Sequence, residues 1–132
     1  MRQFMSITKA LSDENRVRIL LFLKESELCL CQIIEMLQIS AATVSKHISI
    51  LSMAGLVDIR KEGRWHFYRL SEEPTVEAAA AIEFLSKALA NSRPIKEDKA
   101  RVKQVLKMEK EDLCRHYKGL PSPSSSIVLS RS

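Results

Sequence analysis

The strongest constraint on the fold of this chain lies at residues 27–70, where two short helical patterns follow one another with only a tight connection between them. In the first pattern, at residues 28–37, apolar side chains recur at the spacing of a helix with one buried face. Ser40 can cap a second helix that begins at Ala41, and Gly55 suits the left-handed position just after the end of that helix. Two short helices joined by so short a turn predict a helix-turn-helix.

The second helix is expected to have two different faces. Its apolar residues Val44, Ile48 and Leu51 fall on one side, which we expect to face the core. The remaining positions carry hydroxyl groups and a lysine, which suit contact with the phosphates and base edges of DNA. The candidates of this kind are Thr43, Ser45, Lys46 and Ser49.

A charged hairpin is predicted directly after this helix. Residues 56–60 and 65–70 alternate like strands, and the segment 61–64 between them contains the glycine expected at a hairpin tip. From residue 59 to residue 70, four basic side chains stand against one acidic side chain, a net charge of +3. Charged loops are often only solvated, but one that follows a hydroxyl-rich helix is better explained by phosphate contact. The hairpin would then be a wing, and its candidate contacts are Arg60, Lys61 and Arg64.

Together, these motifs resemble the ArsR/SmtB family of winged-helix repressors, and the two-cysteine box resembles the family's arsenic-responsive branch. The motifs are LSDENRVRILLFL from Leu11, ELCLCQI from Glu27, SAATVSKHISILSMAGLV from Ser40 and RKEGRWHFYRL from Arg60, so the resemblance covers about residues 4–90. It implies a homodimeric repressor that binds operator DNA and releases it when cysteine thiolates capture trivalent arsenic (arsenite) or antimony (antimonite). With this resemblance, the candidate DNA contacts extend to Ser40 and to His47, a position that the family uses structurally or near DNA.

Two cysteines, Cys29 and Cys31, are the candidate ligands for the inducer. On a regular helix, residues two apart point about 200° away from each other, so the two sulfurs can converge only if the first turn is unwound. A ligand that requires convergence would therefore distort the helix that supports the recognition helix, and this would couple ligand binding to DNA binding. Spacing alone also permits both cysteines to be small buried hydrophobic residues, whereas the resemblance favours thiolate ligands for a soft ion.

The sequence departs from the arsenic-responsive pattern at two positions. Familiar members have an acidic residue after the second cysteine and a further cysteine soon after it, but this chain has Gln32 and Ile34 there. Because trivalent arsenic usually takes three thiolates, we expect Cys114, the only other thiol, to be the third ligand. A single helix from residue 94 to about residue 117 would be about 36 Å long and could carry this thiol to the other subunit's cysteines. The alternative is that Cys114 is packed in the core.

Length and composition fit one mainly α domain: the chain has 132 residues, of which 45% are hydrophobic and 28% are charged. We expect residues 1–90 to form a winged helix-turn-helix DNA-binding and dimerisation domain, residues 91–118 a C-terminal amphipathic helix, and residues 119–132 a disordered tail rich in proline and serine. A helix after Pro74 has a long apolar face that suits a second copy of itself. Such a helical dimerisation interface would place two recognition helices about one DNA turn, roughly 34 Å, apart on an inverted repeat.

Net charge and the lengths of the apolar runs limit the partners and the cellular compartment that we expect for this protein. The net charge of +5 and the pI near 9.3 permit a polyanionic partner. The longest apolar run, residues 19–23, is too short for a signal peptide or a membrane span, so we expect a cytoplasmic protein that does not bind membranes. In that reducing compartment, three cysteines are not expected to form a disulfide framework.

The nearest alternative function is the same fold sensing another soft metal or thiol oxidation. A zinc sensor is disfavoured, because the family's zinc-sensing branch places Asp and His ligands on the dimer helix, and residues 71–90 contain no histidine. A second alternative is a protein-binding module, which specific binding to an inverted repeat would exclude. We do not expect an enzyme: no histidine has a nucleophile beside it in sequence, and the cysteine pair lacks the βαβ surroundings of a thiol oxidoreductase.

Overall fold

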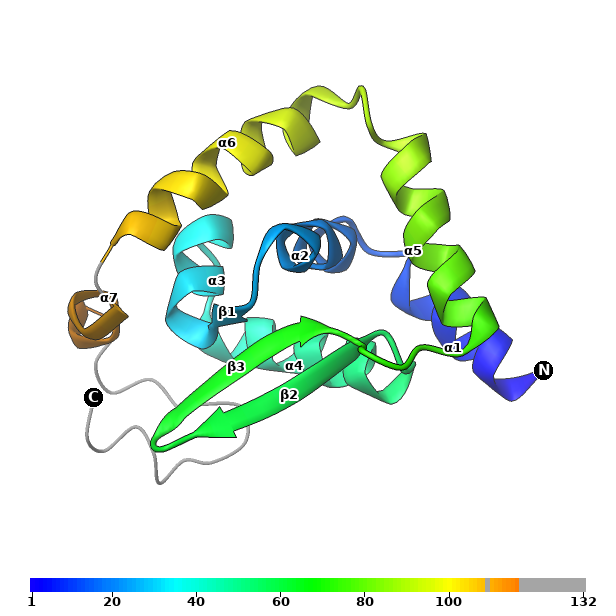
Figure 1. The fold of residues 1–132 in the computed structure, drawn as a ribbon, viewed down its shortest axis with the longest axis horizontal. Coiled ribbons are helices and arrows are strands. Elements are labelled where there is room, and N and C mark those ends of the chain that lie inside the picture. Colours follow the sequence, from blue (N-terminus) through cyan, green and yellow to red (C-terminus); the bar gives the residue numbers. More distant parts are fainter. Residues whose placement is uncertain (109, 117–132) are drawn as a thin grey trace.

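The computed structural model describes residues 1–108 and 110–116, in which helices form most of the molecule and a small antiparallel sheet lies along one side (Figure 1). The helices are α1 (Arg2–Ala10), α2 (Glu14–Glu25), α3 (Leu30–Leu37), α4 (Ala41–Met53), α5 (Val76–Ala88), α6 (Arg93–Lys107) and α7 (Lys110–His116). The strands are β1 (Leu28–Cys29), β2 (Val57–Glu62) and β3 (Trp65–Leu70), and they pair in the order β1-β3-β2. The predicted class, a mainly α winged helix-turn-helix, is confirmed.

Helix α2 lies at the centre of the core (Figure 1). Its N-terminus is capped by Asp13, whose Oδ1 accepts a hydrogen bond from the N–H of Arg16 at 3.1 Å. Ile19, Leu20 and Phe22 are buried, and α2 packs against α4, α5, α6 and β3. Each such side chain contributes about 1.5–3 kcal/mol when it leaves water, so α2 holds the helix-turn-helix, the wing and the C-terminal helices together.

The helix-turn-helix is formed by α3 and α4, and its local signals act as predicted. Ser40 is the N-cap of α4, and its hydroxyl accepts the N–H of Thr43 at 3.2 Å. Gly55 follows the end of α4 with φ +79°, a conformation in which a side chain would be strained. Within the turn, Gln38 has φ 56°, which costs a residue with a Cβ about 1–2 kcal/mol. The turn therefore holds the two helices at one fixed angle at the expense of local strain.

The predicted start of the first helix, at Leu28, was wrong. Leu28 and Cys29 instead form β1, which pairs with β3 so that Leu28 lies opposite Tyr68 and Cys29 opposite Phe67. The pairing satisfies backbone groups on the outer edge of β3, which a helical segment could not do. Because Cys29 is extended and Cys31 is helical, the two thiols are not held on opposite sides of one helical turn, and no unwinding is needed to bring them together.

The wing is the hairpin of β2 and β3, and its tip is shorter than predicted. Glu62 still pairs with Trp65, so only Gly63 and Arg64 form the turn. Gly63 has φ +61°, as the first central residue of a type II′ turn requires. The wing therefore extends its strands almost to its tip.

The predicted single helix from residue 94 to about residue 117 was also wrong. Helix α6 ends at Lys107, Met108 is extended with ψ 144°, and α7 continues in a new direction (Figure 1). Val102 and Val105 on α6 are buried, and both α6 and α7 pack against α3 of the same chain. After the break, the chain therefore packs against α3, the first helix of its own helix-turn-helix, and does not extend outward. The predicted tail at residues 119–132 lies outside the described residues.

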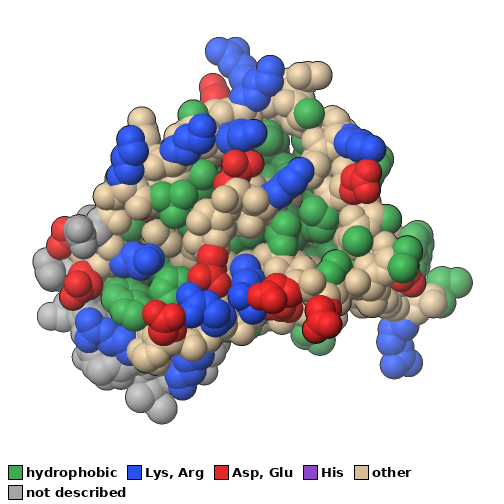
Figure 2. All heavy atoms as spheres, viewed as in Figure 1, with side chains coloured by type: hydrophobic (Ala, Val, Ile, Leu, Met, Phe, Trp, Pro, Cys, Tyr) green, Lys and Arg blue, Asp and Glu red, His purple; other side chains and the backbone are tan. Residues whose placement is uncertain are grey.

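Helices α1 and α5 pack against each other and carry apolar side chains that remain exposed. Phe84 is 67% exposed and Val76 83%, while Phe4 and Met5 on α1 are more than half exposed. Figure 2 shows apolar side chains at the surface of this end of the molecule. Among the described residues, no helix is long and apolar enough to cross a membrane.

Candidate thiol site and DNA interface

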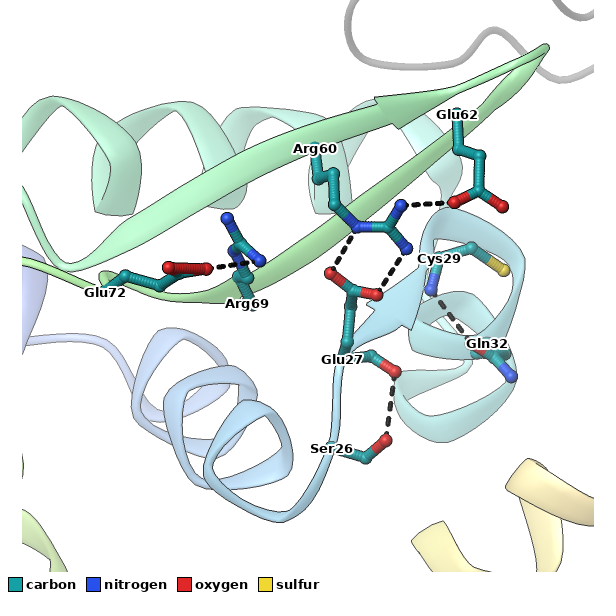
Figure 3. Close-up of polar contacts among 8 residues, drawn as sticks. All are labelled: Ser26, Glu27, Cys29, Gln32, Arg60, Glu62, Arg69 and Glu72. Atoms are coloured by element: carbon teal, nitrogen blue, oxygen red, sulfur yellow. Dashed lines mark hydrogen bonds and ion pairs between the residues drawn. The ribbon is translucent and has the colours of Figure 1, made fainter.

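Cys29 occupies the position just before the first turn of α3, where its backbone and side chain both form capping contacts. Gln32 Oε1 accepts the N–H of Cys29 at 2.9 Å (Figure 3), and the Cys29 sulfur faces the backbone N–H of Gln32 in return. The Gln32 side chain is only 1% exposed. The glutamine that replaces the expected acidic residue therefore acts as a buried cap for the cysteine segment.

The three cysteines come together although Cys114 is far from the other two in sequence. Cys114 is buried on α7, where its thiol hydrogen-bonds with the thiols of Cys29 and Cys31. In this single chain the third thiol lies beside the two cysteines of the same chain, and its role as a ligand stays a prediction. The break at Met108 is what makes this possible, because it allows α7 to turn onto α3.

The surroundings of Cys29 and Cys114 favour the protonated forms of these two thiols. The hydrogen bond with Cys114, followed by burial, raises the pKa of the Cys29 thiol well above its ordinary value, and the N–H groups of Gln32 and Cys31 offset only part of this rise. For Cys114, the hydrogen bond with Cys29 lowers the pKa. The hydrogen bond with Cys31 and burial together outweigh this effect, and they raise the pKa of Cys114 to about 12. Both thiols are therefore protonated at neutral pH.

The donor set suits a thiophilic ion by its chemistry, since three sulfurs adjoin one another in a largely buried place. Across residues 1–108 and 110–116, however, no three His, Cys, Asp or Glu side chains are already arranged around a common point as metal ligands. The thiols contact each other instead. A ligand that binds all three sulfurs must open the contacts between them and take the place of their protons.

A network of ion pairs and ring contacts joins the cysteine segment to the wing. Glu27, directly before β1, binds Arg60 of β2 through two hydrogen bonds of 2.7 and 3.0 Å, and Glu62 pairs with the same guanidinium (Figure 3). The Arg60 guanidinium also lies 4.7 Å from the centre of the Phe67 ring, and Lys110 of α7 lies 5.2 Å from that ring. The segment before Cys29, the wing and the helix that carries Cys114 therefore meet at Phe67.

This network includes one of the predicted DNA contacts, Arg60. The hydrogen bonds with Glu27 and Glu62 raise the pKa of Arg60, while Arg60 lowers the pKa of Glu27. Arg60 is thus already paired with two carboxylates, so its contact with DNA stays a prediction. Lys61 and Arg64 are exposed near the tip, with the Arg64 guanidinium 5.5 Å from the centre of the Trp65 ring. Figure 2 shows Lys and Arg side chains over the wing among several carboxylates.

On the recognition helix α4, the predicted contacts differ in exposure. Thr43, Lys46 and Ser49 are exposed and Ser45 is half-buried. The Ser40 hydroxyl is exposed too, but it lies 2.8 Å from the Thr43 hydroxyl, so the two share a hydrogen bond. This arrangement presents a row of hydroxyls and one ammonium group to solvent, as phosphate and base contact require.

His47 has a structural environment. It is 8% exposed, its Nδ1 lies 3.2 Å from Arg16 Nη1, and its Nε2 lies 4.0 Å from Asp13 Oδ1. Burial lowers the pKa of His47, only partly offset by the nearby Asp13 carboxylate. The side chain therefore helps join α4 to the start of α2, and its contact with DNA stays a prediction.

Sequence reasoning missed two features that shape the site. Arg18 of α2 binds Asp98 of α6 through two hydrogen bonds of 2.8 and 2.9 Å, which fixes the helix that leads to α7. Tyr68 of β3 is fully buried, and its hydroxyl has no hydrogen-bond partner among the described residues. No local pattern marks either feature, because the ion pair joins residues 80 positions apart and Tyr68 resembles any inward residue of a strand.

Comparison with known proteins identifies the family. Residues 13–58 match the family described as "Bacterial regulatory protein, arsR family". An HTH-type transcriptional regulator of Methanocaldococcus jannaschii is 39% identical over 80 residues, which span 60% of this chain and 90% of that protein. The arsenical resistance operon repressor of Escherichia coli K12 is 41% identical over 76 residues, which span 57% of this chain and 65% of the repressor.

A solved structure supports the same assignment. HlyU from Vibrio cholerae superposes with a TM-score of 0.60 and 32% sequence identity, and the match covers 68% of this chain and 95% of HlyU. The matched family segment contains the helix-turn-helix, the cysteine pair and the start of the wing. The chain therefore belongs to the ArsR family of bacterial regulatory proteins, which are DNA-binding transcriptional regulators and not enzymes.

Proposed function

We propose that the protein is a homodimeric repressor that releases its operator when Cys29, Cys31 and Cys114 bind trivalent arsenic or antimony. The observation that carries this proposal is the contact of the Cys114 thiol with both of the other thiols. Arsenous acid, As(OH)₃, can exchange its three hydroxyl groups for three sulfurs, with each thiol proton leaving in a molecule of water. The protonated, buried thiols of Cys29 and Cys114 therefore suit arsenite, because its uptake requires no prior ionisation of these groups.

The cysteine segment offers a direct mechanical connection to both DNA-binding elements. Cys29 lies in β1, which pairs with β3 of the wing, and Cys31 lies in α3, which packs against the recognition helix α4. A ligand that draws the three sulfurs around one atom moves the β1–α3 junction and α7 relative to each other. We infer that ligand and DNA favour different positions of this junction, which is the condition for one to reduce the affinity of the other.

DNA contact is proposed for the exposed side of α4 and for the wing. On α4, Ser40, Thr43, Ser45, Lys46 and Ser49 would contact phosphates and base edges, and Lys61 and Arg64 would contact phosphates from the wing. The exposed apolar residues of α1 and α5 support pairing with a second copy. Two copies would then place their recognition helices about 34 Å apart on an inverted repeat in the cytoplasm.

Electrophoretic mobility shift of the DNA upstream of the protein's own gene tests the proposal, with arsenite, antimonite, zinc, cadmium and peroxide added in turn. We expect arsenite and antimonite to release the wild-type protein. We expect each of the variants Cys29→Ser, Cys31→Ser and Cys114→Ser to bind the operator normally and to resist release. The reason is that the thiols belong to β1, α3 and α7, whereas the proposed DNA contacts lie on the exposed side of α4 and on the wing. Normal release from any of these variants would place the ligand site elsewhere.

Thiol oxidation is a second candidate signal, favoured by the same contact of Cys114 with Cys29 and Cys31. Peroxide would oxidise two of the thiols to one disulfide and be reduced to two molecules of water. Release by peroxide but not by arsenite, with the loss of two titratable thiols, would favour this signal over arsenic.

A further inference from the structure

A cavity of about 270 Å³ lies between α2, α5 and α6, away from the cysteines. Helices α5 and α6 diverge from the short connection at residues 89–92 (Figure 1), and α2 packs against both of them. The cavity is the space that these three helices leave where α5 and α6 part. Figure 2 shows apolar side chains in this hollow, bordered by Lys and Arg side chains.

The wall of the cavity suits the hydrocarbon part of a ligand. The Ser86 hydroxyl on the α5 side donates a hydrogen bond to the carbonyl of Ile82 at 2.9 Å, so its donor is already used within its own helix. The remaining wall is largely apolar, and a ligand that replaces water there gains the free energy of apolar burial. The apolar side chains of α2 and α6 that form this wall are Leu21, Phe22, Ile95 and Val102.

The charged side chains around the cavity leave two cations without a partner. Asp98 accepts two hydrogen bonds from an arginine of α2, and the Glu25 carboxylate lies 3.8 Å from the Lys99 ammonium group. Lys24 of α2 and Lys96 of α6 also line the cavity, and both are exposed. Neither lysine makes an ion pair within residues 1–108 and 110–116. Two ammonium groups from two helices therefore remain for an anion.

Size and position restrict the ligand further. At about 30 Å³ for each group the size of a water molecule, the cavity has room for about nine such groups. Ser86 lies about 200° around α5 from the exposed Phe84, so pairing of two copies through the Phe84 side leaves the cavity open. A small molecule with one short apolar chain and one anionic group matches both the volume and the charges.

We propose that this cavity binds a small amphipathic carboxylate, with its hydrocarbon chain between the three helices and its carboxylate at Lys24 and Lys96. The proposal does not depend on the thiol site, because none of the three cysteines lines the cavity. It goes beyond the proposed function, since it gives the protein a second ligand of a different chemical class.

Calorimetric titration of the full-length protein with straight-chain carboxylates tests the apolar part of the site. Affinity should rise about fourfold for each methylene from hexanoate to octanoate, as burial of apolar surface predicts, and it should level off by about dodecanoate, once the cavity is full. Octylammonium, which has the same chain and the opposite charge, should bind about tenfold more weakly than octanoate, since two exposed ion pairs of about threefold each are lost. Equal binding of the two would overturn the carboxylate as the ligand group.

Substitutions locate the binding site. Ser86→Leu places an apolar side chain in the cavity and should abolish octanoate binding, whereas Ser86→Ala leaves the cavity open and should bind normally. Lys24→Ala and Lys96→Ala should each weaken octanoate binding about threefold. Lys103→Ala is their control, because Lys103 belongs to α6 but does not line the cavity.

The contrary results are equally specific. Wild-type octanoate affinity in a folded Ser86→Leu variant would overturn the cavity as the site, because the acid would then bind another apolar surface. If Ser86→Leu does not fold, the two lysine variants decide, and unchanged affinity in both would overturn the proposal. Cys114→Ser should bind octanoate as the wild type does, so failure of this proposal leaves the thiol site untouched, and failure of arsenite to release DNA leaves this proposal untouched.

Discussion

Protonation of the thiols determines, at the scale of single residues, which ligands enter the site most easily. The pKa of Cys29 is raised mainly by its contact with Cys114, and that of Cys114 is raised to about 12. Below these values, a divalent cation such as Cd²⁺ must expel one proton for each sulfur that it binds. Arsenous acid carries its own hydroxyl groups, which remove the same protons as water.

The two ligands should therefore differ in their dependence on pH. Between about pH 6 and pH 8, arsenite affinity should change by less than about threefold, whereas cadmium affinity should rise about tenfold per pH unit for each thiol that it deprotonates. Calorimetry in buffers of different ionisation enthalpy measures both the affinity and the number of protons released. Steep pH dependence with arsenite would show a net release of protons, which the exchange of its hydroxyl groups for thiols does not produce.

The structural roles of some residues were predictable because they depend only on neighbours in the sequence. The roles of others were not predictable because they depend on residues far away in the sequence. Ser40 and Gly55 mark the ends of α4 because capping oxygen and positive φ are properties of one residue and its nearest neighbours. The role of Gln32 was not predictable, because its side chain caps Cys29 only once Cys29 has left the helix. The unpartnered hydroxyl of Tyr68 follows from the whole packing of β3.

Among the elements, the two predictions that were wrong, apart from the longer hairpin tip, concern segments whose structure depends on a distant strand or helix. Leu28 and Cys29 continue an apolar helical pattern, but the edge of β3 captures them as a strand. The sequence around Met108 consists of good helix formers and contains no Pro or Gly, so nothing local predicts that the helix ends there. The break allows α7 to contact α3. Cys114 was predicted as the third thiol, but its contact with Cys29 and Cys31 of the same chain was not predictable, because it depends on this break.

Helix α6 positions the C-terminal thiol, and its link to α2 is a testable element. Asp98→Asn removes the charge that pairs with Arg18 and should lower the free energy of unfolding by about 1–3 kcal/mol. This is less than for a fully buried pair, because water reaches the Arg18 side chain, which is 23% exposed. Urea denaturation measures the change. Glu97→Gln on the same helix, which breaks an exposed pair of 3.6 Å with Arg93, is the control and should shift stability by less than about 0.5 kcal/mol.

The wing should contribute to DNA affinity through charge alone. Lys61→Ala or Arg64→Ala should weaken binding to all DNA sequences alike and lower the magnitude of the salt slope by roughly one per lost phosphate contact. Fluorescence anisotropy at several salt concentrations provides the slope. Lys96→Ala is a matched control, because the N-terminal part of α6, which contains Lys96, lies on the side of the molecule away from the wing (Figure 1). An unchanged slope in both wing variants would remove the wing from the interface.

The recognition helix should instead contribute to specificity. Thr43→Ala or Ser45→Ala should cost about 1–3 kcal/mol on the operator if the hydroxyl contacts a base edge, and much less on unrelated DNA. The same anisotropy assay with specific and nonspecific duplexes separates the two effects. An equal loss on both duplexes would assign these hydroxyls to the DNA backbone.

For the whole molecule, the question is whether each proposed thiol site is complete within one subunit of the proposed dimer. Helix α7 contacts α3 of its own chain, so we expect Cys114 to serve the Cys29 and Cys31 of the same subunit. Mixed dimers of a Cys31→Ser chain and a Cys114→Ser chain distinguish this arrangement from an exchange of α7 between subunits. Two different affinity tags allow the mixed dimer to be purified from a co-expression.

If the site is formed within one chain, the mixed dimer has no complete site, since each of its subunits lacks one sulfur. X-ray absorption on its arsenic should then show two sulfur neighbours, as in Cys114→Ser alone, against three in the wild type. If α7 exchanges between subunits, Cys114 of the first chain completes the Cys29 and Cys31 of the second. The mixed dimer would then bind one arsenic per dimer with three sulfur neighbours, and the break at Met108 would serve to cross the dimer instead of closing the site within its own chain.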